Sequence, residues 1–259
     1  MIGCCEPSQT NSGVKTVPAA LMVVALSMAS AAGIPAAAAD ETRRARDGMV
    51  ADVLAMWRLT QREVGGSAPD RKVIDVLAKV PRHEFVPHDA RNKAYANRPL
   101  PIGLGQTISQ PYIVALMTDL AGVDEQSRVF ELGTGSGYQA AVLAEIAGEV
   151  YTMEIIEPLA ESAAKRLERL GYENVRVRHG DGYYGWKEHA PFDAIVVTAA
   201  ASHVPPPLVE QLAVGGKMVI PVGSGFAVQQ LVLVEKHAAD RIVVKQMLPV
   251  RFVPLTGGH

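Results

Sequence analysis

The stretch that most constrains the fold of this chain is residues 129–144, VFELGTGSGYQAAVLA. The apolar run before the glycines predicts a buried strand, and the helix-like spacing after them predicts an amphipathic helix. Between the two, Gly133, Gly135 and Gly137 stand at every second position. A strand, a tight glycine turn and a helix N-terminus are the usual beginning of a nucleotide-type binding site in an open α/β sheet.

The spacing of these glycines favours one class of ligand. They form G-x-G-x-G, whereas the dinucleotide fingerprint is G-x-G-x-x-G. Glu131, just before the glycines, would bring a negative charge towards a pyrophosphate, which disfavours NAD. A ligand with a cationic amino group and a sulfonium, but no phosphate, suits that charge, and S-adenosylmethionine fits this description. The alternative is that the glycines only shape a turn between a strand and a helix.

Strands alternate with helices over the second half of the chain, which predicts a mostly parallel sheet covered on both faces. The seven predicted strands are 128–132, 150–154, 175–178, 193–198, 216–222, 229–235 and 242–248. Helices are predicted at about 137–147, 157–170 and 206–213. Because only a short link joins the last two strands, they should form a C-terminal antiparallel hairpin.

The segment before this sheet is predicted to be helical and partly irregular. Helix-like spacing covers residues 43–62, 70–80 and 111–121, and the proline- and glycine-rich residues 81–110 look irregular. We therefore predict a single domain over residues 40–259. Within it, residues 40–110 form an N-terminal cap and substrate loop, and residues 111–259 form the ligand-binding sheet.

Residues 1–39 have the features of a leader rather than of that domain. Lys15 precedes an apolar stretch over residues 17–32, and an A-x-A site ends at Ala39, which together predict a secretory signal peptide and export to the periplasm. The stretch is too short for a membrane anchor. The alternative is a disordered extension. Both cysteines, Cys4 and Cys5, lie in this leader, so cleavage would leave no disulfide, thiol nucleophile or thiolate metal site.

Composition is that of an ordinary soluble protein. The 259 residues are 48% hydrophobic and 20% charged, with a formal net charge of -2. Nucleic-acid binding normally calls for a basic surface, so a near-neutral chain disfavours that partner.

Three further segments carry side chains suited to a binding site. Glu154 ends a predicted strand, where a carboxylate can accept hydrogen bonds from ribose hydroxyls or simply be solvated. Asp181, beside Gly182, can accept from an adenine amino group or serve as a turn residue. Arg251 is a cation in an apolar segment and can bind a carboxylate or pair within the fold.

The loop 101–112, PIGLGQTISQPY, is the second informative segment. Thr107, Ser109 and Gln110 lie just before a predicted helix, where hydroxyls and backbone N–H groups can receive an anion. The alternative is simple N-capping by Ser109. No metal site is predicted, because His83 and His88 would not share a helix face.

Taken in order, eight segments resemble the protein-L-isoaspartate O-methyltransferase family, and they span nearly all of the chain after the leader. The matching segments are VPRHEFVP (80–87), PIGLGQTISQPYIVALM (101–117), VFELGTGSGYQAAVLA (129–144), VYTMEIIEP (150–158), HGDGYYGW (179–186), PFDAIVVTAAA (191–201), GGKMVIPVG (215–223) and PVRFVPLTG (249–257). Three features depart from the family pattern: Ala96 replaces a frequent acidic residue, residues 49–80 are longer than expected, and the leader is unusual in a family that is usually cytoplasmic.

The resemblance implies a Rossmann-like methyltransferase fold and a protein repair enzyme. The methyl group would pass from S-adenosylmethionine to the free carboxylate of L-isoaspartyl, and also D-aspartyl, residues in damaged proteins and peptides. It also implies that Ser109 is the active-site serine, with Thr107, Gln110 and Arg251 on the substrate side. The implied cofactor-binding residues are Glu131, Gly133, Gly135, Gly137, Glu154, Asp181 and Gly182. A monomer without metal or membrane anchor is expected.

Such a reaction needs little acid–base chemistry, because a carboxylate with a pKa of about 3.9 is already ionised at neutral pH. Ser109 is therefore expected to orient the carboxylate rather than to act as a nucleophile. Two rival functions remain at this point: methylation of a small molecule, which needs no TISQP loop, and a non-catalytic exported binding protein.

Overall fold

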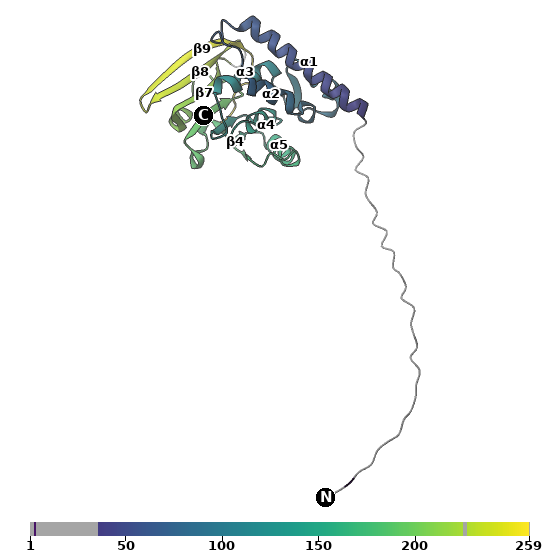
Figure 1. Cartoon of the computed structure of the whole chain (residues 1–259). Coiled ribbons are helices and arrows are strands. Elements are labelled where there is room, and N and C mark those ends of the chain that lie inside the picture. The colour runs from purple at the N-terminus through teal and green to yellow at the C-terminus, as the bar shows by residue number, and fades with distance from the viewer. Residues whose placement is uncertain (1–2, 4–35, 225–226, 259) are drawn as a thin grey trace.

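A seven-stranded sheet forms the centre of the molecule in the computed structural model (Figure 1), which describes Gly3, residues 36–224 and residues 227–258. The predicted leader lies outside the described residues, apart from Gly3 and residues 36–39. The strands of the sheet are β3 (Arg128–Leu132), β4 (Glu149–Glu154), β5 (Val175–His179), β6 (Phe192–Val197), β7 (Leu212–Val222), β8 (Gln229–Ala238) and β9 (Arg241–Val250). Their order is β5-β4-β3-β6-β7-β8-β9.

The first five strands in this order run parallel, and β8 and β9 are antiparallel to their neighbours. The predicted α/β fold with a C-terminal antiparallel hairpin is confirmed. Strands β4 and β5 lie on one side of β3, and β6 and β7 lie on the other. The carboxyl ends of β3, β4 and β6 therefore border the crevice at this switch point.

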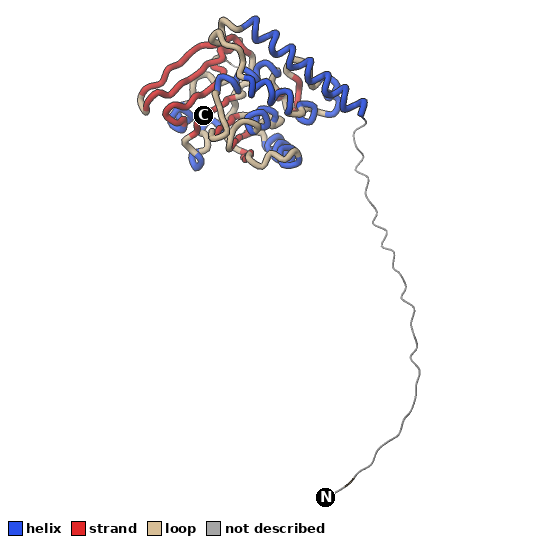
Figure 2. Tube along the Cα trace, viewed as in Figure 1, coloured by secondary structure: helices blue, strands red, loops and turns tan. Residues whose placement is uncertain are grey.

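Helices cover the two faces of the sheet (Figure 2). The α-helices are α1 (Ala36–Thr60), α2 (Arg71–Lys79), α3 (Pro111–Ala121), α4 (Tyr138–Ala144), α5 (Glu157–Arg169) and α6 (Pro206–Gln211). Short 3-10 helices are η1 (Arg82–Phe85), η2 (His88–Lys93), η3 (Gly182–Tyr184) and η4 (Lys187–His189). Among the described residues, no helix has the length and apolar character needed to cross a membrane.

Alternation along the strands divides the core into two parts. Val129 on β3 packs among the side chains of α1 to α4, whereas Phe130, its neighbour, packs on the opposite face with Leu208 of α6. Ala194 and Ile195 on β6 divide in the same way. Successive residues of a strand point to opposite faces, so runs of consecutive apolar residues are required in a sheet that is covered on both sides.

One part of the sequence prediction is wrong. Residues 81–110 are not irregular throughout, because they contain η1, η2 and a two-stranded antiparallel hairpin, β1 (Leu100–Gly103) and β2 (Gln106–Ile108). The strands are three and four residues long, too short for alternation to be visible in the sequence. The hairpin leads directly to Ser109.

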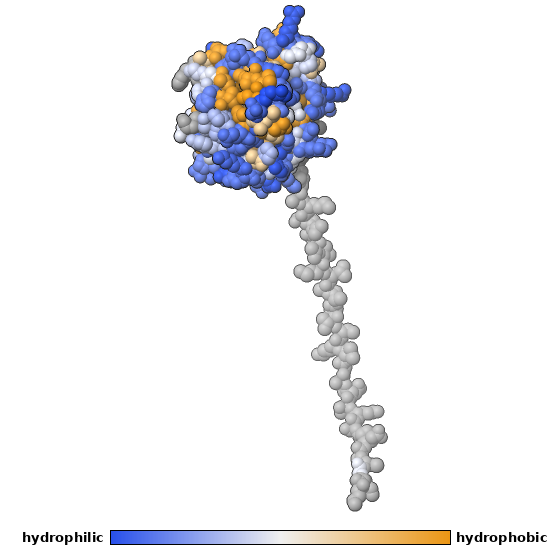
Figure 3. Space-filling view, turned by 90° about the vertical axis from the view of Figure 1, so that its left-hand side faces the viewer, coloured by the Kyte–Doolittle hydropathy of each residue, from blue (hydrophilic) through white to orange (hydrophobic). Residues whose placement is uncertain are grey.

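Hydrophobic side chains gather on the face of the molecule that carries β7, β8 and β9 (Figure 3). The exposed large side chains there include Val228 before β8 and three consecutive residues of β9, Ile242, Val243 and Val244. Strand β9 is the last in the sheet order, so it forms one edge of the sheet.

Candidate active site

Two pockets meet at the carboxyl edge of the sheet. The glycine-turn pocket is lined by residues that include Gly133, Gly135, Glu154, Ile156, Gly182 and Leu255. The serine cleft, about 440 Å³ in volume, is lined by residues that include Pro99, Ser109, Gln110, Ile113, Arg251 and Phe252. Thr107 and Thr198 line both, and they also line a small space between the two, together with Ser109 and Gly135. A molecule in one pocket can therefore reach a molecule in the other.

The glycine turn depends on glycine for two physical reasons. Gly133, Gly135 and Gly137 have φ angles of 95°, 53° and 87°, which side-chain-bearing residues rarely adopt. A Cβ atom on Gly133 would also lie 2.4 Å from the hydroxyl oxygen of Thr198. The turn therefore brings bare backbone to the wall of the pocket.

Glu154 stands where the sequence placed a ribose-binding carboxylate. It ends β4, is buried, and lines the glycine-turn pocket. Its Oε2 accepts a hydrogen bond from the Gly135 N–H at 2.8 Å, and its Oε1 accepts from the Ile156 N–H at 3.0 Å. Each oxygen keeps a lone pair, so the carboxylate is held in one orientation and can still accept hydrogen bonds from a ligand.

Asp181 and Gly182 follow β5 and differ in their relation to the pocket. Gly182 lines it, and a Cβ there would lie 2.5 Å from Leu132 Cγ. The carboxylate of Asp181 accepts from the Tyr183 N–H at 3.0 Å and from the Gly258 N–H at 3.2 Å. Asp181 thus acts as a turn residue and also contacts the C-terminal segment, and its adenine-binding role stays a prediction.

Glu131 does not present its charge to the pocket in the way that the sequence suggested. It is completely buried and is not among the residues that line the glycine-turn pocket. Thr152 donates its hydroxyl to Glu131 Oε2, and Oε1 has no partner among the described residues. Burial, assisted by the nearby charge of Glu154 and opposed by the hydrogen bond from Thr152, raises the pKa of Glu131 to about 8. At neutral pH this carboxyl is therefore mostly protonated.

The hydroxyl of Ser109 is a free polar group in the serine cleft. It makes no hydrogen bond to any described residue, while the Ser109 carbonyl accepts from Arg82 Nη2 at 2.7 Å. Gln110 donates its amide to the Asn97 carbonyl at 3.0 Å, and the Asn97 side chain accepts from the Tyr112 N–H. The predicted N-cap role of Ser109 is wrong, because Gln110 is the cap residue of α3 and makes no side-chain cap bond.

Arg251 lies across the cleft from this loop. Its side chain is exposed, and it makes no ion pair with another described residue. An unpaired guanidinium at the cleft wall suits recognition of a carboxylate.

Sequence reasoning missed Thr198. Its hydroxyl donates to the carbonyls of Leu132, at 3.0 Å, and Gly133, at 2.7 Å, so it fastens β6 to the start of the glycine turn. A signal was present, because Thr198 directly follows β6, and the carboxyl ends of adjacent parallel strands meet at one edge.

Metal ligation has no support in the part of the chain that the structure describes. No group of three or more His, Cys, Asp or Glu side chains there is arranged to hold a metal ion. His83 instead hydrogen-bonds the Tyr95 hydroxyl through Nδ1, at 2.7 Å.

Comparison with known proteins identifies close relatives over most of the chain. A family model described as Protein-L-isoaspartate(D-aspartate) O-methyltransferase matches residues 56–259. A Syntrophobacter fumaroxidans protein named protein-L-isoaspartate O-methyltransferase 2 is 61% identical over 95% of this chain and 99% of its own length. A Polaromonas protein of the same name is 64% identical over 81% of this chain and 99% of its own length.

Solved structures give the same result. A protein-L-isoaspartate O-methyltransferase structure superposes with a TM-score of 0.70 at 30% identity, covering 82% of this chain and 66% of the solved one. A candidate protein-L-isoaspartate O-methyltransferase from Plasmodium falciparum, in complex with S-adenosyl-L-homocysteine, superposes with a TM-score of 0.64 at 26% identity. That alignment covers 79% of this chain and 97% of the solved one.

Proposed function

Since the chain belongs to the protein-L-isoaspartate(D-aspartate) O-methyltransferase family, we propose that it repairs damaged proteins. It transfers a methyl group from S-adenosylmethionine to the free carboxylate of L-isoaspartyl residues, and also of D-aspartyl residues. The observation that carries this proposal is the meeting of the serine cleft and the glycine-turn pocket at Thr107 and Thr198. A methyl donor and a carboxylate acceptor can each occupy one pocket and touch.

The residues that line the glycine-turn pocket suit S-adenosylmethionine, which would supply an electrophilic methyl group when bound. Glu154 presents two fixed carboxylate oxygens that suit a ribose diol, and Gly133 and Gly135 leave room for close approach of the ligand to the backbone. Met153, Leu132 and Leu255 supply apolar wall for the rest of the molecule. Methyl transfer from a sulfonium to an ionised carboxylate does not call for a metal.

The serine cleft positions the acceptor. Ser109 donates its free hydroxyl to the isoaspartyl carboxylate, Arg251 offers a guanidinium, and Thr107 stands at the junction with the other pocket. The acceptor is already ionised, so no residue has to remove a proton. Holding donor and acceptor in line can supply roughly 7–11 kcal/mol of barrier reduction. Charge is lost as the methyl group moves, so a dry junction favours the reaction.

The decisive experiment is methyl transfer to a matched pair of peptides. One peptide contains an L-isoaspartyl residue and the other contains an ordinary L-aspartyl residue at the same position. The proposal predicts transfer from radiolabelled S-adenosylmethionine to the first peptide alone. Transfer to small molecules but to neither peptide would favour a small-molecule methyltransferase, and peptide binding without transfer would favour a binding protein.

We further propose that residues 1–39 direct export and that the enzyme works as a monomer. The leader carries the pattern of a signal peptide. Cell fractionation with N-terminal sequencing tests export, and an intact N-terminus in the cytoplasmic fraction would contradict it. Light scattering measures the molar mass in solution, and the mass of a dimer would contradict the proposed monomer.

A further inference from the structure

The most unusual charge in the molecule is Arg82 on η1. Its side chain is completely buried, and no described carboxylate forms an ion pair with it. Nε donates to the Ala94 carbonyl at 2.8 Å, and Nη2 donates to the Ser109 carbonyl at 2.7 Å. Nη1 has no partner among the described residues. Burying a charge without a counter-ion is costly, so stability alone does not account for an arginine here.

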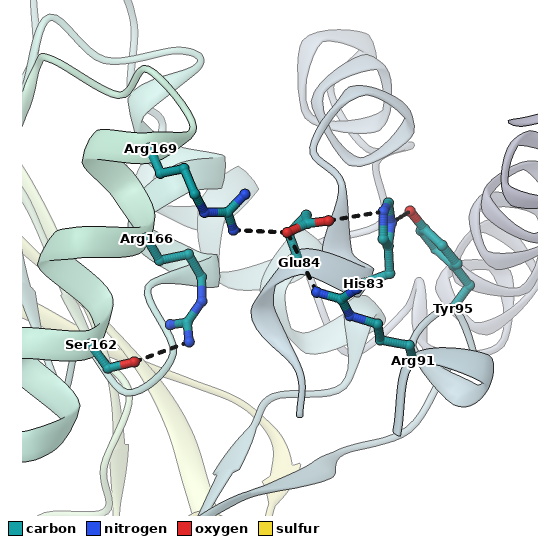
Figure 4. A network of polar contacts seen from close by, with 7 residues as sticks. All are labelled: His83, Glu84, Arg91, Tyr95, Ser162, Arg166 and Arg169. Carbon is teal, nitrogen blue, oxygen red and sulfur yellow. Dashed lines mark hydrogen bonds and ion pairs between the residues drawn. The ribbon is translucent and has the colours of Figure 1, made fainter. Parts of the chain in front are cut away.

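The segment around Arg82 is fixed from two sides (Figure 4). Glu84 accepts from Arg169 Nη2 of α5 at 2.8 Å and pairs with Arg91 of η2 at 3.7 Å. His83 bonds the Tyr95 hydroxyl. These contacts tie η1 both to the helix that follows β4 and to the residues after η2. These contacts therefore hold in place the backbone from which the Arg82 side chain extends.

The other side of Arg82 contacts the element that follows the glycine turn. Its guanidinium carbon lies 4.6 Å from the ring centroid of Tyr138, the first residue of α4. Tyr138 lines the same small space as Ser109, where the two pockets join. Arg82 is thus packed between Ser109 and the start of α4, although it lines neither pocket itself.

We infer that Arg82 is a positioning residue for methyl transfer, acting through Ser109. This inference rests on the proposed function. Its guanidinium fixes the Ser109 carbonyl, so the serine backbone cannot rotate and the hydroxyl stays directed into the serine cleft. Arginine suits the task because its planar fork reaches two carbonyls while stacking on a ring, which a lysine ammonium cannot do.

A double-mutant cycle tests the inference. Arg82→Lys should lower kcat/KM for the isoaspartyl peptide by roughly 10- to 100-fold, because a displacement of about 1 Å can cost on the order of 100-fold. S-adenosylhomocysteine affinity, measured by calorimetry, should stay within about twofold. In a Ser109→Ala background the same change should cost almost nothing, because the group that it positions is gone. An equal loss in both backgrounds would show a general structural role and overturn the inference.

Two further measurements keep the test independent of folding and of activity. The second variant is Arg82→Gln, which keeps amide donors but removes the charge. The matched control is Arg176→Lys, an exposed position on β5, and its kinetics should be unchanged. Hydrogen exchange of the amides of residues 107–110 should speed up in the Arg82 variants and not in the control. Unchanged hydrogen exchange in the Arg82 variants would overturn the inference. Failure of the wild-type enzyme to transfer a methyl group would contradict only the proposed function, because the exchange measurement does not depend on activity.

Discussion

Thr107, Ser109 and Thr198 are three of the hydroxyl-bearing residues that line the junction of the two pockets, and their hydrogen bonds separate their roles. The Thr198 hydroxyl donates to the carbonyls of Leu132 and Gly133, so its role is to stabilise the turn. The hydroxyls of Thr107 and Ser109 have no partner among the described residues. Of the three, Thr107 and Ser109 have hydroxyls available to an acceptor, and Ser109 lies in the cleft without bordering the glycine-turn pocket.

Ser109→Ala is therefore expected to lower kcat on an isoaspartyl peptide by roughly 10- to 100-fold, since orientation of the acceptor is lost. S-adenosylhomocysteine affinity should be unchanged in calorimetry. Ser67→Ala, an exposed position outside both pockets, is the control and should keep wild-type kinetics. Wild-type turnover in Ser109→Ala would remove this serine from the reaction.

Glu154→Ala is expected to weaken cofactor binding. Hydrogen bonds to a charged group are worth about 1.5–3 kcal/mol, which is roughly a 10- to 100-fold increase in Kd. Glu154→Gln should give an intermediate value, because it keeps one acceptor oxygen. Calorimetry with S-adenosylhomocysteine measures both, with exposed Glu161→Ala on α5 as the control. Equal affinity in all four proteins would exclude Glu154 from the site.

Glu131 predicts a pH dependence of stability with a definite sign. The folded-state pKa is about 8 and the ordinary value is 4.5, so between these pH values the unfolded carboxyl is ionised while the folded one holds a proton. Unfolding then releases a proton, and the free energy of unfolding falls as pH rises through this range. The neutral Glu131→Gln should remove this decline, as thermal melts at pH 5 to 8 would measure. The same decline with pH in the Gln variant would show that Glu131 does not cause it.

At the scale of elements, the glycine turn is the piece whose shape matters most to ligand binding. Its backbone contacts Glu154 of β4, Thr198 after β6 and Arg166 of α5, which donates to the Ser136 carbonyl at 2.8 Å. Three separate elements thus hold one turn. A change in its path should alter all of these contacts together.

A matched pair of glycine substitutions separates the cost of backbone strain from the effect of a changed turn on cofactor binding. Gly133 and Gly171 have φ angles of 95° and 82°, so alanine at either position should cost about 1–2 kcal/mol of stability. Only at Gly133 would the new Cβ also meet Thr198, whereas Gly171 has nothing within 4 Å. Gly133→Ala should therefore lose cofactor affinity in calorimetry, and Gly171→Ala should retain it. Equal affinities would show that the turn tolerates a side chain.

At the scale of the whole molecule, the end of the chain returns to the site. After β9, the Leu255 N–H donates to the Ala200 carbonyl, and the Ala200 N–H donates to the Val253 carbonyl, each at 2.8 Å. Residues 253–256 line the glycine-turn pocket. A segment more than 100 residues from the glycine turn in sequence thereby supplies one wall of the cofactor site.

Shortening the chain tests this wall. A saturating ligand at 100 times its Kd stabilises the folded state by about 2.7 kcal/mol, so S-adenosylhomocysteine should raise the Tm of the full chain. A chain that ends at Arg251 should show a much smaller rise, because residues 253–256 are missing. A chain that ends at Thr256 is the control and should behave like the full chain. An equal rise in all three would show that the wall contributes nothing to binding.

The local pieces could be predicted from the amino-acid sequence: the strand pattern, the glycine turn, Glu154 at the end of β4, and residues 107–111, TISQP, with Ser109. These follow from periodicity, backbone conformation and short motifs, which act between residues close in the chain. Three features could be seen only once the chain was folded: the burial and protonation of Glu131, the bonds from Thr198 to the turn, and the bond from Arg82 to the Ser109 carbonyl. Burial and long-range hydrogen bonds depend on which segments fold against one another, and that information is spread over the whole chain.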